Sequence, residues 1–131
     1  MNKIKQYLQE YSYLKSIQSL LHWDMETMMP TGAIEDRAKR LGYVQGKIHA
    51  HITSPEYKKL LKEFAQKKNL SRSDLILLKE LKWDYDLNFA LPPQHVEELT
   101  LASAHASHVW AKAKTNNDLK SYLPHLQKLI D

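Results

Sequence analysis

The chain has 131 residues, of which 43% are hydrophobic and 26% are charged, a composition typical of one globular domain with its own core. It contains no cysteine, which excludes disulfides and thiolate chemistry, and it has no apolar run of the roughly 18–20 residues that span a bilayer. The net charge of +4 comes mostly from lysines spread along the chain. We therefore expect a cytoplasmic protein that binds neither nucleic acid nor a membrane.

The sequence predicts about six helices and no strand. The first is expected from Asn2 to about Met28, because its apolar residues recur every three or four positions. Pro30 ends it, since the residue before a proline is displaced from helical backbone angles. The second is expected from Thr31 to about His51.

The second predicted helix carries a small residue at every fourth position: Ala38, Gly42, Gly46 and Ala50. A glycine inside a helix costs about 1 kcal/mol relative to alanine. Two such glycines on one face are explained if another helix packs closely there and offsets that cost. We therefore predict that these four residues form a helix-packing face.

The third and fourth helices have clear start signals. Ser54 followed by proline predicts a helix over residues 55–68, and Ser71 with Asp74 forms a capping box that opens a helix to about Ala90. Apolar residues lie on more than one side of the fourth helix. We expect it to be central, or to be covered by something outside this chain.

A fifth helix is expected from Pro93 to about Thr115, and a sixth from Leu119 to about Ile130, with a turn over residues 116–118 between them. The predicted fold is all-α, with long antiparallel helices joined by short loops in a single helical domain over residues 1–131.

The segment LLHWDMETMMP, residues 20–30, contains several groups that could bind a metal. His22 and Glu26 share a helix face, but two ligands are too few for a zinc site. Met25, Met28 and Met29 could form a soft copper(I) site, although methionines at helical spacing are more often core residues.

A structural interpretation of this segment is simpler. Asp24, next to Trp23, lies near a helix end and could accept hydrogen bonds from the free N–H groups of residues 32–34. We therefore predict that the segment forms the corner between the first two helices. The residues assigned to this corner motif are Trp23, Asp24, Glu26, Met29 and Pro30.

The best local metal candidate lies on the fifth helix. His105 and His108 are three residues apart, and Glu98 precedes His105 by two turns near the same face. The alternative is that all three lie on a solvated face, because the bulky stripe of this helix points elsewhere. His49 with His51, and Asp84 with Asp86, are two residues apart and point in different directions on a helix, so neither makes a good functional pair.

The chain has no HExxH, Walker, nucleophile-elbow or GxGxxG motif, so the residues alone assemble no catalytic site. Tyr13–His49, which contains the WDMETMMP corner and a following Gly-Ala, resembles the start of the carboxypeptidase Taq family of metallocarboxypeptidases. Later segments match this family in order: TSPE at residues 53–56, WDYD and LP at 83–92, and WAKA, ND and LP at 110–124.

The resemblance implies an N-terminal part that contributes to the wall and lid of a substrate channel in an enzyme about four times longer. Members of the family bind zinc through an HExxH helix and a downstream glutamate, and the HExxH glutamate is the general base that activates water against the C-terminal peptide bond. No residue here matches those elements, so we expect no catalytic residue and no cofactor in this chain, with zinc present in full-length members.

Two functions remain open from the sequence. The first is an N-terminal, non-catalytic segment of a zinc carboxypeptidase, whose partner is the rest of that enzyme and whose substrate is a peptide. The second is a stand-alone helical interaction module, which could pair with a second copy of itself.

Overall fold

The computed structural model describes residues 2–131, without the side chain of Asn2. These residues form six α-helices and one short 3-10 turn, and no strand occurs among them. The all-α prediction is confirmed. The elements are α1 (Asn2–Thr27), η1 (Thr31–Ala33), α2 (Ile34–Ile52), α3 (Pro55–Ala65), α4 (Arg72–Phe89), α5 (Pro93–Asn116) and α6 (Leu119–Ile130).

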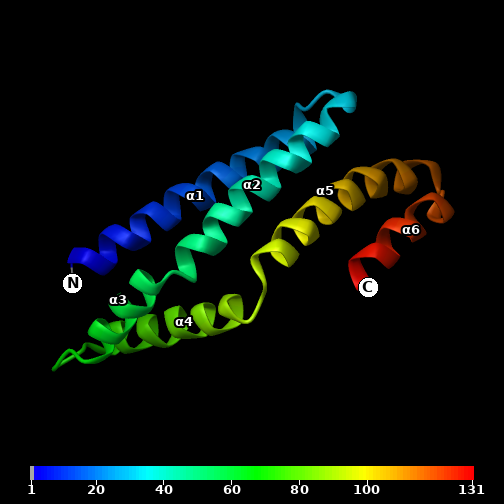
Figure 1. The fold of residues 1–131 in the computed structure, drawn as a ribbon. Helices are drawn as coiled ribbons and strands as arrows, with labels where there is room; N and C mark the ends of the chain where they lie inside the picture. The colour runs from blue at the N-terminus through cyan, green and yellow to red at the C-terminus, as the bar shows by residue number, and fades with distance from the viewer. Residues whose placement is uncertain (1) are drawn as a thin grey trace.

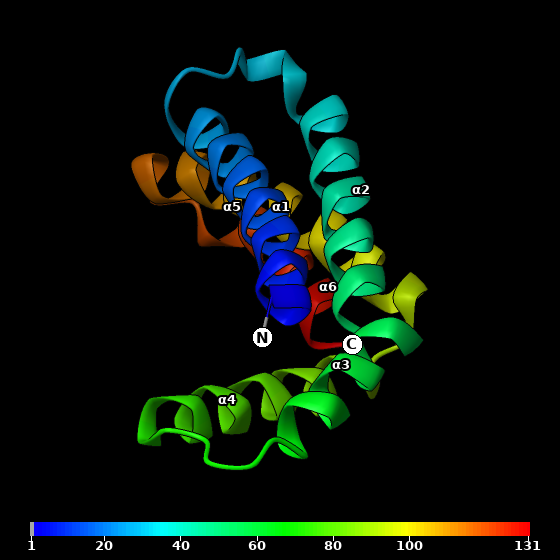
Figure 2. The same ribbon diagram turned by 90° about the vertical axis from the view of Figure 1, so that its left-hand side faces the viewer.

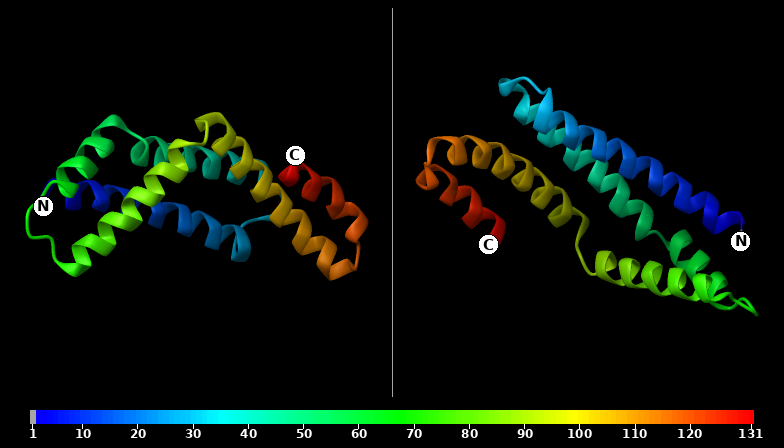
Figure 3. Two further views of the ribbon diagram at one scale, coloured as in Figure 1. Left: turned by 90° about the horizontal axis from the view of Figure 1, so that it is seen from below. Right: turned by 180° about the vertical axis from the view of Figure 1, so that it is seen from behind.

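The helices form an elongated arrangement of antiparallel pairs (Figure 1). Helices α1 and α2 make a long hairpin, and α3 with α4 forms a second hairpin at one end of it, seen clearly in Figure 2. Helix α5 packs along α2, and α6 turns back against α5. Figure 3 shows from two further sides that the α3–α4 and α5–α6 pairs occupy opposite ends of the molecule. No helix among residues 2–131 is both long and apolar enough to cross a membrane.

The buried apolar residues form two separate clusters along the α1–α2 hairpin. One cluster joins the start of α1 and the end of α2 to the α3–α4 pair, through residues that include Ile52, Tyr57 and Phe64. The other joins the start of α2 to α5, through Ala38 and Ala104. The described residues therefore contain two buried clusters rather than one central core.

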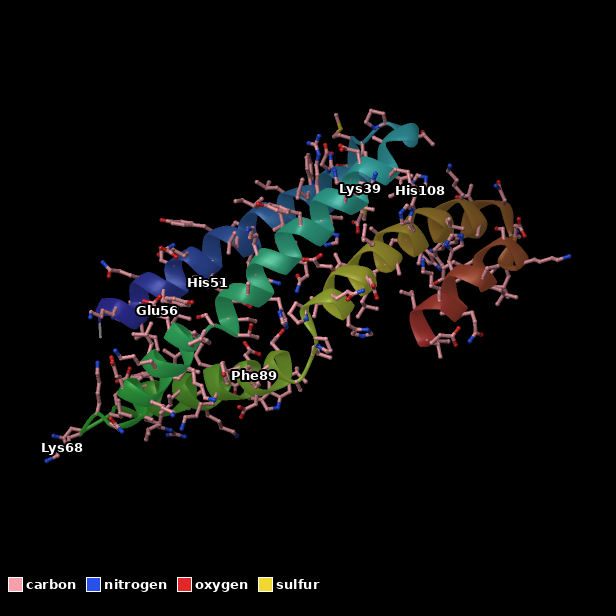
Figure 4. The ribbon with its side chains drawn as sticks, in the orientation of Figure 1. Lys39, His51, Glu56, Lys68, Phe89 and His108 are labelled. Carbon is pink, nitrogen blue, oxygen red and sulfur yellow. The ribbon has the colours of Figure 1, made fainter. Side chains whose placement is uncertain are left out.

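The predicted start signals of α3 and α4 are present. The Ser54 side chain accepts a hydrogen bond from the Tyr57 N–H, and Ser71 and Asp74 form the reciprocal capping box. The end of α3 differs from the prediction, since the helix stops at Ala65 rather than Lys68. The residues after Ala65 are polar and exposed, so no packing extends the helix, and Lys68 lies at the tip of the α3–α4 connection (Figure 4).

Helix α4 is not central, so the first of the two alternatives expected for it is wrong, and cover from outside this chain stays an expectation. The helix lies at the edge of the molecule, where it packs mainly on α3 and touches the end of α2 (Figure 2). Only Leu78 and Tyr85 of α4 are buried. Its opposite side carries the exposed residues Ile76, Trp83 and Leu87. No other part of the described chain covers them.

The face of α2 that carries the small residues packs against α5. A Cβ atom added to Gly42 would lie 3.4 Å from Cγ of Leu101 and 3.7 Å from the carbonyl oxygen of Glu97. Ala38 is fully buried on the same face. Ala50, assigned to this face from the sequence, is exposed instead. A four-residue step advances about 40° beyond a full helical turn, so the fourth member has rotated away from α5.

The corner between α1 and α2 is closed by Arg37. Its guanidinium forms a salt bridge with the Asp24 carboxylate and donates a hydrogen bond of 2.8 Å to the carbonyl oxygen of Leu21. The structure thus gives Asp24 a different partner from the N–H groups of residues 32–34 proposed from the sequence. The carbonyl oxygen of Asp24 also accepts hydrogen bonds from the backbone N–H groups of Met28 and Met29, with N–O distances of 3.0 and 2.8 Å. One guanidinium therefore links the last turns of α1 to the first turn of α2.

The other end of the α1–α2 hairpin is joined by aromatic and hydroxyl groups. The Tyr7 hydroxyl donates to the carbonyl oxygen of His51 at 2.8 Å and lies 2.6 Å from the Ser54 hydroxyl. The Tyr7 ring stacks on the His51 ring, with centroids 3.9 Å apart, and on the Tyr57 ring at 5.3 Å. Burial, reinforced by the nearby Asp84 carboxylate, raises the pKa of the Tyr57 hydroxyl to about 12.

Replacing the two glycines of α2 should have opposite effects on the free energy of unfolding. Gly42→Leu should lower it by about 1–3 kcal/mol, because the larger side chain would force α5 away from α2. Gly46→Ala should preserve or raise it by up to about 1 kcal/mol, since only the exposed, flexible Glu97 carboxylate must move. Urea denaturation measures both effects. Equal losses in the two variants would contradict the close contact at Gly42.

Asp24→Ala should lower the free energy of unfolding by about 1–2 kcal/mol and the melting temperature by several degrees, because Arg37 would lose its counter-ion. The side chain of Arg37 is only 15% exposed. Asp36→Ala is the matched control. It removes an exposed salt bridge with Arg40, which lies one helical turn later, and should change the free energy of unfolding by less than about 0.5 kcal/mol. Thermal unfolding compares the two, and a melting temperature unchanged by Asp24→Ala would disprove the role of this corner.

The raised pKa of Tyr57 predicts a loss of stability in alkaline solution. A hydroxyl whose folded-state pKa lies above its unfolded value stabilises the fold fully below the unfolded pKa of about 10. That contribution is lost as the pH rises from about 10 to 12. Tyr57→Phe should reduce the pH dependence in this range, whereas Tyr13→Phe, at an exposed position, should leave it unchanged. Denaturant titrations at a series of pH values test this, and identical slopes in the two variants would count against it.

Candidate functional site

The three residues proposed as a metal site on α5 do not come together with a common partner. The Glu98 carboxylate accepts a hydrogen bond of 2.8 Å from the Gln94 amide and is exposed. Nε2 of His105 lies 3.7 Å from a carboxylate oxygen of Glu35 on α2. Within residues 2–131, no three His, Asp or Glu side chains form a group that could hold a metal ion. A catalytic zinc needs three protein ligands, so these residues do not fit one.

His108 lies three residues after His105 on the same helix. It is half-buried on α5, where this helix passes the α1–α2 corner (Figure 4). Burial, together with the nearby Lys112 ammonium and His105, lowers the pKa of the His108 imidazole. The lowered pKa favours the uncharged form of the ring.

The metal-binding residue types near the end of α1 are also dispersed. His22 and Glu26 are both exposed. Met25 packs against the buried cluster formed by α2 and α5, whereas Met28 is 71% exposed. Trp23 is 59% exposed, so its indole is not part of the buried corner. The structure thus packs Met25 against a buried cluster and leaves His22, Glu26 and Met28 exposed.

The pairs spaced two residues apart diverge. Nε2 of His49 lies 2.9 Å from the carbonyl oxygen of Asn88 at the end of α4, and its Nδ1 is buried without a hydrogen-bond partner. His51 points instead to α1, where its Nε2 lies 3.0 Å from the carbonyl oxygen of Tyr7. Each histidine fixes a different neighbouring helix. Asp84 is half-buried and Asp86 is exposed, in keeping with different directions.

A groove runs along α5 between the end of α1 and α6, and the sequence reasoning missed it. Its larger part has a volume of about 720 Å³ and its smaller part about 310 Å³, and the two share Trp110 and Tyr122. We call it the α5–α6 groove, and define it by Met25, Glu26, His108, Trp110, Tyr122 and Leu129 with the intervening small residues of α5. The signal in the sequence is the alternation of the small residues Ser103, Ala106 and Ala111 with Trp110, because small side chains leave space above the helix surface.

Known carboxypeptidases match this chain along nearly its whole length. Thermostable carboxypeptidase 1 of Pyrococcus furiosus is 28% identical over 130 residues, and carboxypeptidase 1 of Bacillus subtilis is 27% identical over 125 residues. The alignments cover 97% and 95% of this chain, but only 26% and 25% of those proteins. The chain thus spans about a quarter of the length of these relatives.

The fold is also that of a solved relative. The structure described as "BsuCP Crystal Structure" superposes with a TM-score of 0.90 at 27% identity, covering 95% of this chain and 25% of the other. A family model described as carboxypeptidase Taq (M32) metallopeptidase matches residues 3–131. That match shows that the chain belongs to the carboxypeptidase Taq (M32) family of metallopeptidases.

Proposed function

We propose that this chain is the N-terminal helical part of a zinc-dependent carboxypeptidase that removes C-terminal residues from peptides, and that it does not itself carry the catalytic centre. The observation that carries the proposal is the extent of the match. Nearly all of the chain superposes on a quarter of a carboxypeptidase structure, with the helices in the same arrangement. The cytoplasmic location expected from the cysteine-free sequence is part of this proposal.

The distribution of ligand residues supports the non-catalytic role. The closest approach of the expected residue types on α5 is a pair, His105 with Glu35, and a zinc centre that activates water needs a third protein ligand and an open position. These residues do not fit the metal of the family. In the proposed enzyme, zinc and the groups that act on the peptide bond belong to the other three quarters of the polypeptide.

The contribution of this part is a rigid scaffold. Helix α2 packs against both α1 and α5, with the Arg37 corner at one end of the α1–α2 hairpin and the Tyr7–His51 stack at the other. Long helices fixed at both ends make a stiff surface, which suits the wall of a channel for a peptide substrate.

A stand-alone interaction module is the second candidate. The exposed residues of α4, Ile76, Trp83 and Leu87, favour it, because isolated soluble domains rarely expose so many large apolar side chains on one helix. The same residues are equally explained by contact with the rest of an enzyme. The two candidates make different predictions for a chimera in which this chain replaces the matching part of a related carboxypeptidase: only the first predicts an active enzyme.

The chain on its own should bind no zinc in fixed stoichiometry and should not hydrolyse a blocked dipeptide with a free C-terminus. The measurements are metal analysis after gel filtration and a peptidase assay with added zinc. One tightly held zinc per chain would overturn the proposal. Should that occur, His105→Ala and Glu98→Gln would show whether the α5 candidates hold it, with exposed His22→Ala as the control.

A chimera tests the positive half of the proposal. Residues 3–131 should replace the matching quarter of Bacillus subtilis carboxypeptidase 1 and yield an active, zinc-containing peptidase. The Gly42→Leu variant should reduce this activity, because it displaces α5, whereas Gly46→Ala should not. A folded but inactive chimera, with a chain that associates with itself in isolation, would favour the interaction module.

A further inference from the structure

Helix α6 is amphipathic but buries none of its residues. It packs mainly on α5, toward which it turns Tyr122 and Leu129. A second apolar row lies beside these two and is largely uncovered by the described part of the chain: Leu119, at the edge of the smaller hollow, Leu123 and Ile130 are 65%, 49% and 70% exposed. A helix with a broad apolar face normally buries it against two neighbours, and here one of the two is missing.

The α5–α6 groove lies next to this exposed row. Trp110, which is 47% exposed, and Tyr122 line both parts of the groove, so the two hollows form one continuous surface. Helix α6 has 12 residues and is therefore about 18 Å long, so a partner helix of three turns would match it. Two antiparallel helices with a groove between them are the usual receptor of an amphipathic helix.

The two ends of the groove carry opposite charges. Glu26 lines only the larger hollow, at the end formed by α1. Lys114 lines only the smaller hollow, near the turn at Asn117, and its ammonium lies 4.8 Å from the centre of the Trp110 ring. His108 also lines the larger hollow, and burial and the nearby Lys112 lower its pKa, which favours the uncharged ring. The charges of a complementary partner would run in the reverse order.

The relatives contain a large amount of polypeptide beyond the part that matches this chain. They are about four times longer than this chain and match it over a quarter of their length, so three quarters of each is polypeptide that this chain does not represent. The α5–α6 pair is present in the superposed quarter, which covers 95% of the chain. An apolar surface on that pair has several hundred further residues available to cover it.

We propose that the α5–α6 groove and the adjoining row Leu119, Leu123 and Ile130 are the docking site of an amphipathic helix from the remaining three quarters of the carboxypeptidase. That helix places a basic residue at the Glu26 end and an acidic residue at the Lys114 end. The inference rests on the proposed function, because it takes the partner to be the rest of the enzyme.

Thiol labelling tests the docking site directly, because the chain has no cysteine of its own. Leu123→Cys should react rapidly with a maleimide in the isolated chain and about tenfold or more slowly in the Bacillus subtilis chimera, because a docked helix protects it. Lys59→Cys, on the exposed side of α3, is the control and should change less than about twofold. Peptide mapping by mass spectrometry separates the labelled site from cysteines elsewhere.

The outcomes separate the docking site from the proposed function. An active chimera in which Leu123→Cys stays fully reactive would overturn the docking site and leave the proposed function standing. An inactive chimera in which Leu123→Cys is protected would overturn the proposed function and leave the docking site standing. If labelling of Leu123→Cys in the isolated chain slows as the concentration of the chain rises, the groove binds a second copy. If labelling slows when a peptide is added, the groove binds substrate. Either result would overturn the proposal.

The charge polarity has its own test in the chimera. Lys114→Glu should lower its melting temperature, because the acidic residue expected opposite Lys114 would then face a like charge. Lys59→Glu serves as the control for a change of two charges at an exposed site. Equal melting temperatures for the two variants would overturn the assigned orientation of the docked helix.

Discussion

The contact between α2 and α5 is the constraint on which the arrangement depends. At Gly42 there is no side chain, and the backbone of α5 at Glu97 and the Leu101 side chain come within van der Waals reach of where a Cβ would stand. That proximity brings Ala38 and Ala104 into one buried cluster and fixes the direction of α5. Helix α6 is in turn placed by α5, so the position of the whole C-terminal pair follows from a missing side chain in α2.

The two ends of the α1–α2 hairpin are stabilised by different chemistry. At the corner, a guanidinium bridges a carboxylate and a carbonyl oxygen, and its contribution depends on charge. At the other end, Tyr7, His51 and Tyr57 stack, and hydroxyl groups complete the backbone hydrogen bonds. The first end is sensitive to loss of a counter-ion and the second to ionisation of a buried phenol, so different solution conditions act on different ends.

The sequence predicted the helices well because their boundaries are local. Ser54, Ser71 and the prolines act within one turn of the chain, and the capping groups they predict are present. What the sequence did not reveal depends on neighbours distant along the chain. Arg37 as the partner of Asp24, the exposure of Ala50 and the edge position of α4 follow from how whole helices cross, which apolar periodicity does not specify. The α5–α6 groove is of the same kind, since its walls come from residues about a hundred positions apart.

The presence of two buried clusters has a consequence for folding cooperativity. The cluster with Phe64 and the cluster with Ala38 share no residue, and both α1 and α2 contribute to each of them. We therefore expect the two ends to form separate foldons, which open independently while the hairpin between them stays helical.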